Sequence, residues 1–320
     1  MRGEQLNYSI GVRQEKIIKE AIKRFDRHRI KLNECFFCGS VNAILLTKYD
    51  RVGVPCSVVS CTQCQFVFQV DRIAPQVLRS CYQSSSLEIR GKSVDKRSLL
   101  HLFEKRVKLF ATKRCDNILD HMALTKSDLI FEIGCGDGAN LFPFHLKGFD
   151  VFGIDIDKKN IEIARENGLN VVFGDYDDIE GMDIRPKVII LSHFAGHVND
   201  IVSFLKKIKE MLSRTKGAIL YLESPGYRCK QWLSSRSGIL PYFDFEPLYY
   251  FDKKTLCRLM SAQGLYPIYC DEFVTGLFGL EKQSTEPEEV ISSADYFMTI
   301  EREYQMSLKG LVNWCLRRAI

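Results

Sequence analysis

A glycine-rich loop between an apolar strand pattern and a helix pattern constrains this chain more than any other feature of its sequence. Residues 129–133 form a short apolar run that predicts a buried strand, and residues 139–147 predict a helix. The loop between them contains Gly134, Gly136 and Gly138. Glycines let the chain turn tightly and bring its backbone against a ligand, beside the partly positive start of the next helix. The loop therefore indicates a ligand site at the end of a strand.

The chain after this loop alternates between strand and helix patterns. We expect strands at 151–154, 171–173, 188–191 and 218–222, and helices at 158–167 and 201–212. Such alternation is typical of an α/β fold with a Rossmann-like, doubly wound, mostly parallel sheet and helices on both faces. Ligands of these sheets bind beyond the carboxyl ends of the strands, so the loops there should hold the site residues.

Acidic residues stand at the ends of the expected strands. Asp155 follows Gly134 by 21 residues, which is the spacing at which a carboxylate accepts hydrogen bonds from ribose hydroxyls. Asp175 ends the third strand and could accept the adenine amino group. Glycines and acids together predict a nucleoside site.

Two cofactors compete for that site. Gly134, Gly136 and Ala139 satisfy the loose dinucleotide fingerprint, so a nicotinamide enzyme is an alternative. Glu132, just before the loop, favours a cationic ligand, because a carboxylate repels a pyrophosphate. The acids therefore favour a positively charged adenosine derivative.

Two C-x-x-C pairs occur upstream, Cys35 with Cys38 and Cys61 with Cys64, separated by 22 residues. Two such turns supply four sulfurs for the tetrahedron that structural zinc prefers, with no open position for catalysis. Strand patterns at 44–48, 54–59 and 66–68 surround the second pair, with a turn at 50–53. We expect a small zinc-ribbon-like module in which the metal is structural.

Several stretches together resemble the ordered motifs of class I S-adenosylmethionine-dependent methyltransferases, from about residue 128 to residue 271: Glu132–Asn140, Gly153–Asp155, Gly174–Asp175, Leu191–His193 and Tyr221–Pro225. With the cysteine module in front, the order resembles a subgroup found among sugar and surface-polysaccharide methyltransferases. The resemblance implies a set of contacts to S-adenosylmethionine. The residues near its methionine and ribose would be Glu132, Gly134, Cys135, Gly136, Gly138 and Asp155. The residues beside its adenine would be Ile156, Asp175 and Tyr176. The methyl-donating side would be lined by Ser192 and His193.

Methyl transfer from a sulfonium is an in-line displacement, and positioning supplies most of its rate. A hydroxyl or carbon nucleophile also needs a general base within hydrogen-bond reach. We expect His197 or Glu246 to be that base and Tyr249 to orient the substrate, while His193 shapes the pocket on the cofactor side.

Residues 245–251 resemble the segment in which sugar C-methyltransferases carry a His-Glu-His motif. Glu246 keeps the central position, but Phe245 and Pro247 stand where the histidines would be. Because the usual base is missing, we expect transfer to a hydroxyl of a sugar or carrier-linked small molecule.

The excess of positive over negative charge lies in the first 32 residues of the chain. This segment has nine Lys and Arg and four Asp and Glu, which accounts for the whole net charge of +5. Ile18, Ile22 and Phe25, with Ile30 beyond, predict a basic amphipathic helix. It either packs on its own protein or binds phosphate-bearing substrate or nucleic acid. An RNA-modifying or nucleic-acid-binding protein is therefore one alternative, and a cofactor-binding module without catalysis is another.

The patterns divide the chain into five expected segments: a basic arm at 1–32, the zinc module at 33–72, a helical linker at 73–127, the methyltransferase domain at 128–280, and an acidic linker with a helix at 281–320. Residues 226–243 are expected to form a lid or substrate loop. No apolar run reaches the roughly 20 residues that cross a bilayer, and the first thirty residues lack the apolar region of a secretory signal. We expect a cytoplasmic protein whose partner is a small-molecule or carrier-linked sugar substrate.

Overall fold

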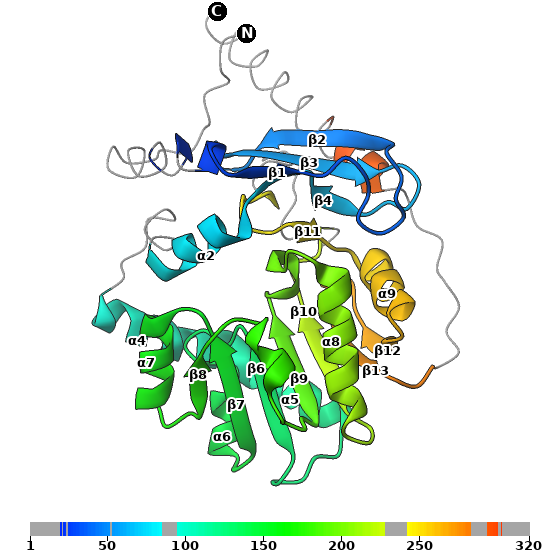
Figure 1. Cartoon of the computed structure of the whole chain (residues 1–320). Helices are drawn as coiled ribbons and strands as arrows, with labels where there is room; N and C mark the ends of the chain where they lie inside the picture. Colours follow the sequence, from blue (N-terminus) through cyan, green and yellow to red (C-terminus); the bar gives the residue numbers. More distant parts are fainter. Residues whose placement is uncertain are drawn as a thin grey trace, which may run out of the picture. The chain divides into compact units, whose positions relative to one another are not determined.

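The computed structural model describes residues 20, 22–23, 25–51, 53–84, 95–227, 242–282, 293–299 and 302 (Figure 1). The chain divides into two compact units, unit 1 with residues 1–77, 225–256 and 286–320, and unit 2 with residues 78–224 and 257–285. Most of the expected basic arm, residues 228–241 of the expected lid and residues 303–320 of the expected last helix lie outside the described residues. Within the described ranges, every helix is too short or too polar to span a membrane.

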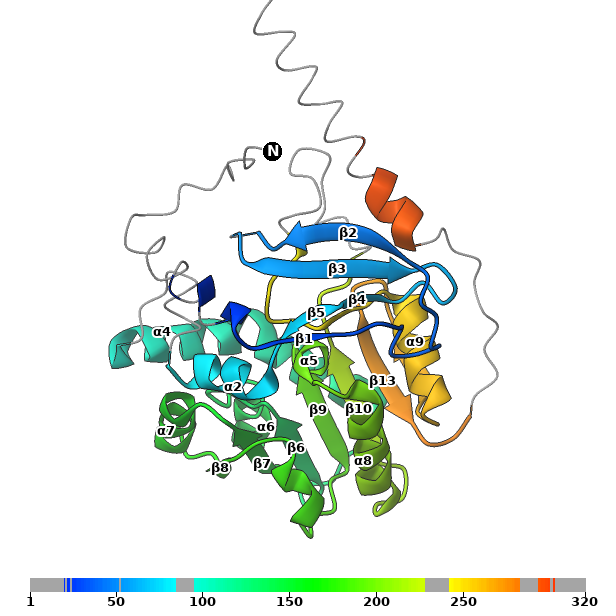
Figure 2. The same ribbon diagram turned by 45° about the horizontal axis from the view of Figure 1, so that its top comes forward.

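Unit 1 is built on a four-stranded antiparallel sheet in the order β11-β4-β3-β2, whose strands are β2 (Ala43–Tyr49), β3 (Pro55–Cys61), β4 (Val67–Gln69) and β11 (Tyr249–Tyr250). The expected hairpin is confirmed, and β2 and β3 lie side by side in both views (Figure 2). Its turn is fixed by the Asp50 carboxylate, which accepts a hydrogen bond from the Val54 N–H at 2.8 Å. Buried Cys56, Val58, Val67 and Phe297 form part of its core.

A short strand replaces the end of the expected basic helix. Residues 20, 22–23 and 25–26 are helical, but Ile30 lies in β1 (Arg29–Lys31). This strand pairs antiparallel with β5 (Asp71–Ile73), which follows the cysteine module. The expectation that Ile30 continues the helical pattern is therefore wrong, because pairing with β5 satisfies the backbone groups of this segment.

Unit 2 contains a seven-stranded sheet in the order β12-β13-β10-β9-β6-β7-β8. Its strands are β6 (Leu129–Ile133), β7 (Asp150–Asp155), β8 (Val171–Phe173), β9 (Val188–Ser192), β10 (Ile219–Glu223), β12 (Tyr266–Cys270) and β13 (Thr275–Gly279). The five strands from β10 to β8 are parallel, and β13 and β12 are antiparallel. The five expected parallel strands are confirmed. The strand order reverses between β6 and β9, where sheets of this type bind ligands beyond the carboxyl ends.

The described part of the chain includes the helices α2 (Pro75–Ser84), α4 (Lys96–Arg106), the π-helix η1 (Val107–Ala111), α5 (Thr112–His121), α6 (Phe142–Leu146), α7 (Lys158–Glu166), α8 (Ile201–Ser213) and α9 (Lys253–Ala262). It also includes the short 3₁₀ turns η2 (Asp178–Gly181) and η3 (Ala195–His197). In Figure 1, α8 lies in front of the sheet and α5 behind it. Helix α8 begins at the N-cap Asp200, whose carboxylate accepts from the Ser203 N–H at 3.0 Å, and it buries Phe204, Leu205 and Ile208.

Helix α6 is shorter than the sequence predicts. The expected helix spans residues 139–147, whereas α6 begins at Phe142. Gly138 accepts hydrogen bonds from the N–H groups of Leu141 and Phe142 in a tight turn before the helix. Pro143 lies in the first turn, where its missing N–H costs nothing. The glycine loop is longer for this reason.

Candidate functional site

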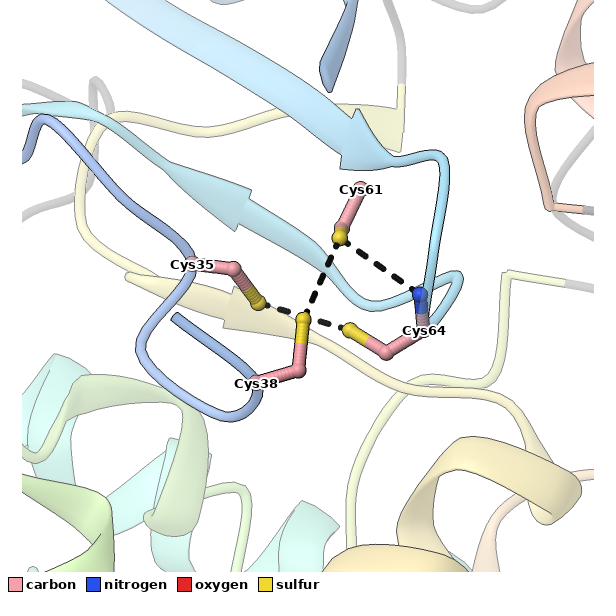
Figure 3. Close-up of side chains that lie close together, drawn as sticks. All are labelled: Cys35, Cys38, Cys61 and Cys64. Atoms are coloured by element: carbon pink, nitrogen blue, oxygen red, sulfur yellow. Dashed lines mark hydrogen bonds between the residues drawn. The ribbon is translucent and has the colours of Figure 1, made fainter. Parts of the chain in front are cut away.

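The four cysteines of the two C-x-x-C pairs converge in unit 1 (Figure 3). Their Sγ atoms all lie within 4.8 Å of one another, with 3.4 Å between Cys35 and Cys64 and 3.6 Å between Cys38 and Cys61. Sulfurs at about 2.3 Å from a tetrahedral zinc stand about 3.8 Å apart. The donor set and its spacing therefore fit a closed tetrahedral metal site.

Each pair is bent by the same local device. The N–H of Gly39 donates to the Cys35 carbonyl, and the N–H of Gln65 donates to the Cys61 carbonyl, both at 2.9 Å. Gly39 and Gln65 follow the second cysteine of each pair and have positive φ values of 71° and 63°. These matching turns aim both thiols of a pair at one point.

Tyr249 and Glu246 also belong to unit 1 and are buried, with 3% and 2% of their surface exposed. The centroid of the Tyr249 ring lies 4.6 Å from that of Phe36, one of the two residues between Cys35 and Cys38. Its hydroxyl accepts a hydrogen bond from Arg72 Nη1 at 3.2 Å. Sequence patterns missed Arg72, because a buried arginine has no periodic signature.

The glycine loop of unit 2 turns in the left-handed region three times, at Gly134, Gly136 and Gly138, with φ values of 73°, 54° and 75°. A Cβ on Gly134 would lie 2.2 Å from the ring of Phe194, so close packing alone requires glycine there. A Cβ on Gly136 would meet no heavy atom within 4 Å. Gly136 therefore borders open space at the carboxyl edge of the sheet, where a ligand could approach its backbone.

Glu132 is 1% exposed at the end of β6. Its Oε1 accepts a hydrogen bond from Asn140 Nδ2 at 2.7 Å, but among the described residues its buried Oε2 has no hydrogen-bond partner. Burial raises the pKa of Glu132 to about 8, although Asn140 and Arg114 oppose the shift. A buried acceptor without a donor suits a ligand that brings a cation and N–H groups.

The Asp155 carboxylate ends β7 and binds the backbone of two loops. Oδ2 accepts from the Gly136 N–H and Oδ1 from the Asp157 N–H, each at 2.8 Å. Burial raises its pKa, and these two backbone bonds oppose the shift. Ile156 follows and is half-buried. The carboxylate keeps further lone pairs for a ligand, since it can accept about four hydrogen bonds.

Asp175 and Tyr176 follow β8, and an arginine that sequence patterns missed contacts both. Arg79 of α2 lies with Nε 2.7 Å from Asp175 Oδ2, and its guanidinium stands 5.7 Å from the ring centroid of Tyr176. The Tyr176 ring also packs edge-on against Phe204, at 5.5 Å. Burial raises the pKa of Asp175, whereas Arg79 lowers it. Asp175 is therefore already ion-paired.

The end of β9 holds Ser192 and His193, and the turn η3 ends at His197. His193 has φ of 54°, which is unusual for a residue other than glycine, and its N–H donates to the Glu223 carbonyl at 2.7 Å. Its Nε2 lies 3.2 Å from Glu223 Oε1. The structure thus brings the histidine beside the end of β10.

Arg114 of α5 connects the ends of three strands. It donates to Glu223 from Nε at 2.5 Å and from Nη2 at 2.6 Å, and to Asn140 Oδ1 from Nη1 at 3.0 Å. Asn140 in turn binds Glu132, and Tyr221 OH donates to Glu223 Oε2 at 2.8 Å. Burial raises the pKa of Glu223, but Arg114 and His193 outweigh it and hold that pKa well below its ordinary value.

The π-helix η1 places a second arginine, Arg106, beside the glycine loop. Arg106 ends α4 and forms an ion pair with Asp137 of the glycine loop, eight residues before Arg114. In a regular α-helix eight residues rotate about 80° past two turns, but a π turn absorbs about one extra residue and returns both arginines to one face. In η1 the Thr112 N–H accordingly donates to the Val107 carbonyl. An amphipathic pattern does not reveal such a turn.

Comparisons with known proteins agree with this geometry. A protein-family model described as a methyltransferase domain matches residues 103–269, just over half of the chain. The ubiquinone biosynthesis O-methyltransferase of Pelagibacter ubique (strain HTCC1062) is 29% identical over 137 residues, covering 38% of this chain and 55% of that protein. The C-methyltransferase NovU of Streptomyces niveus is 23% identical over 256 residues, covering 73% of this chain and 56% of that protein. The chain spans about half the length of these curated relatives.

Among solved structures, Streptomyces venezuelae DesVI is 16% identical, with 58% of this chain and 98% of that chain covered and a TM-score of 0.45. The family match itself includes both Arg106 and Arg114 as well as the glycine loop. The expected Rossmann-like sheet of the class I S-adenosylmethionine-dependent type, with a cysteine module before it, is confirmed. With residues 103–269 matched, this chain belongs to the methyltransferase domain family.

Proposed function

We propose that this protein transfers the methyl group of S-adenosylmethionine to a hydroxyl of a sugar or another small or carrier-linked acceptor. The observation that carries the proposal is the buried Glu132 Oε2 without a hydrogen-bond partner in the described part of the chain, beside the glycine loop. This carboxylate is the kind of group that binds the ammonium of the donor. A nicotinamide dinucleotide would bring a pyrophosphate instead, which offers neither a cation nor an N–H donor to this buried oxygen.

In this proposal each cofactor residue contacts a different part of the methyl donor. Glu132 accepts from the ammonium, the open backbone at Gly136 borders the methionine and ribose, and Asp155 accepts from the ribose hydroxyls. Around them we place the other expected contacts: Gly134, Cys135, Gly138, Ile156, Asp175, Tyr176, Ser192 and His193. When bound, the donor supplies an electrophilic methyl group on a positively charged sulfur.

A hydroxyl acceptor is favoured by what surrounds Glu246. Phe245 and Pro247 flank it, so this segment offers no histidine to remove a proton from carbon. Relatives include both an O-methyltransferase and a C-methyltransferase by name, so the residues of this chain decide the proposal. We propose that His197 contacts the acceptor, and we keep Glu246 as a base and Tyr249 as an orienting group as predictions to be tested by substitution.

The cysteine cluster has a separate part in the proposal. We propose that Cys35, Cys38, Cys61 and Cys64 bind one zinc ion that stabilises unit 1. Four thiolates leave no open position for water or substrate, so the metal takes no part in methyl transfer.

Calorimetry on the full chain tests the cofactor part. S-adenosylhomocysteine should bind, and Glu132→Gln should weaken its affinity about tenfold or more, because a hydrogen bond to a charged group is lost. Glu162→Gln, at an exposed position of α7, is the matched control and should leave affinity unchanged. Absence of binding, together with binding of nicotinamide dinucleotide, would contradict the proposal.

A screen with methyl-tritiated S-adenosylmethionine tests the acceptor part. Nucleotide-linked sugars and phenols carry the hydroxyls that should be labelled. Labelling of RNA alone would instead support the nucleic-acid alternative, and binding of the donor without labelling of any acceptor would support a silent module.

A further inference from the structure

Three phenylalanines in the described ranges have exposed side chains. Phe110, Phe173 and Phe273 are 51%, 45% and 53% exposed, whereas the other phenylalanines of these ranges are buried or half-buried. Single exposed apolar residues are common on protein surfaces, so their position decides whether they indicate a binding site. Phe173 ends β8, on the side of the sheet edge proposed for adenine. The positions of the other two are more informative.

Phe110 lies between the two arginines that bind loops of the carboxyl edge. Arg106 and Arg114 stand four residues before and after it, and the π turn of η1 keeps these three positions on one face. Arg106 binds Asp137 of the glycine loop, and Arg114 binds Glu223 at the end of β10. The Arg114 guanidinium lies 5.6 Å from the centroid of the Phe110 ring. The ring is therefore held near the end of β10.

A strained turn places Phe273 beside the same strand end. The turn joins β12 to β13, and its fully buried Val274 has φ of 63°, a costly conformation for a β-branched residue. The Val274 carbonyl accepts from the Ser224 N–H at 3.1 Å, and the next residue, Thr275, pairs with Glu223. Such strain persists where surrounding contacts fix it, and it concentrates at functional sites. The contacts to β10 fix this turn, and Phe273 with it.

The proposed donor contacts and the two rings occupy different parts of the sheet edge. Glu132, Asp155 and Asp175 stand at the ends of β6, β7 and β8. Phe110 and Phe273 lie beside the end of β10, and β9 separates β10 from β6 in the sheet. Ligands of such sheets bind beyond the carboxyl ends of the strands. Because the donor takes the edge from β6 to β8, the acceptor should bind over β9 and β10.

The polar side chains around the end of β10 already bind one another. Arg114 donates to Glu223 and to Asn140, and the Tyr221 hydroxyl donates to Glu223. A sugar brings several hydroxyls, and each needs a hydrogen-bond partner when it leaves water. A phenol brings a hydroxyl on a flat apolar ring, which phenyl groups contact in offset or edge-to-face geometry. The surroundings of this strand end therefore favour a phenol over a sugar.

We propose that Phe110 and Phe273 bind the ring of the acceptor, and that this acceptor is a phenol. The two side chains contact the ring, exclude water from it and orient its hydroxyl toward the donor. They are positioning residues for the acceptor, while the donor is bound by the residues at the ends of β6, β7 and β8. The inference rests on the proposed methyl transfer to a hydroxyl.

The tritium screen tests the acceptor class. Catechol and 4-nitrophenol serve as phenol probes, and uridine diphosphate glucose serves as the nucleotide-linked sugar. The phenols should be labelled and the sugar should not. Labelling of the sugar without the phenols would overturn the inference and leave the proposed function standing, whereas labelling of RNA or amines alone would contradict both.

Kinetics with the phenol that is labelled best test the two rings. Phe110→Ala and Phe273→Ala should each raise KM for that phenol about tenfold, because an aromatic contact is lost, with kcat and S-adenosylhomocysteine affinity within threefold of wild type. Leu109→Ala in η1 and Ile268→Ala in β12 are the matched controls. Their side chains are also exposed, at 42% and 39%, and these variants should keep the wild-type KM.

Conservative variants and resonance measurements complete the test. Phe110→Tyr and Phe273→Tyr should keep KM within threefold of wild type, because each retains an aromatic ring. In the full chain labelled with 4-fluorophenylalanine and saturated with S-adenosylhomocysteine, the same phenol should shift the fluorine signals of Phe110 and Phe273 and leave that of Phe173 unchanged. Wild-type KM in both alanine variants, or a shift confined to Phe173, would overturn the inference.

Discussion

Arg114 binds Glu223 with two hydrogen bonds, of 2.5 and 2.6 Å, across 109 residues of sequence. Their side chains are 14% and 19% exposed, so the pair is largely withdrawn from water. It joins a helix that precedes the sheet to the end of β10 and, through Asn140, to Glu132. The pair therefore links the end of β10 to the proposed ammonium acceptor.

Breaking this pair on one side should destabilise the protein. Arg114→Gln or Glu223→Gln alone should lower the free energy of unfolding by about 3 kcal/mol, because each leaves a charge in a poorly hydrated place. The double variant should lose clearly less than the sum of the two, since neither charge is then stranded. Urea unfolding of the wild type, the two single variants and the double variant measures this double-mutant cycle. Additive losses of the free energy of unfolding would show that the pair is not coupled.

Glu132 should make stability depend on pH. Its pKa is about 8 in the folded chain against an ordinary value of 4.5, so between these values the folded state binds the proton that the unfolded state has released. The contribution of Glu132 to stability is therefore complete below about pH 4.5 and is lost as pH rises toward 8. Thermal unfolding from pH 5 to 8 should show a fall that is smaller in Glu132→Gln; identical slopes in the two chains would contradict the burial effect.

The same residue should couple donor binding to proton release. At pH 7 the carboxyl of the free chain is mostly protonated, and binding of an ammonium should ionise it. Calorimetry of S-adenosylhomocysteine in buffers of different ionisation enthalpy should detect about one proton released in wild type. In Glu132→Gln the released amount should be near zero, and equal release in both chains would assign the proton to another group.

Zinc removal should act on unit 1. The purified full chain should contain one zinc per molecule, and Cys38→Ser or a strong chelator should remove it and unfold the strands β2, β3 and β4. The sheet of unit 2 should retain S-adenosylhomocysteine binding. Cys56→Ser is the matched control, because Cys56 lies in β3 but outside the four-cysteine cluster. Metal content and hydrogen exchange measure the outcome, and a metal-free chain with unit 1 intact would contradict it.

Sequence patterns predicted the parallel strands of unit 2 well, because each is a short apolar run bounded by turns. The spacing of Cys35, Cys38, Cys61 and Cys64 likewise predicted their convergence. These features are local or have fixed spacing, so single-sequence reasoning can find them. The strand at Ile30 was missed because its pairing with β5 is decided by tertiary contact.

The polar network around the glycine loop could not be predicted. Arg114 lies 109 residues before Glu223, and its direction depends on a π turn that leaves no periodic signal. Arg79 meets Asp175 across a similar distance, 96 residues apart. Sequence reasoning places the acids, since they end strands, but it cannot find the cations that the fold brings to them.

The central claim is that the glycine loop receives the methyl donor, and Gly136→Ala compared with Gly148→Ala tests it most directly. Both glycines have positive φ, 54° and 80°, and at both positions a Cβ would meet no heavy atom within 4 Å. The two substitutions should therefore cost similar stability, of about 1 kcal/mol. Gly148 precedes β7, at the amino edge of the sheet, where no donor contact is proposed. Calorimetry should find that Gly136→Ala weakens S-adenosylhomocysteine binding at least tenfold while Gly148→Ala does not; equal affinity in the two variants would contradict the claim.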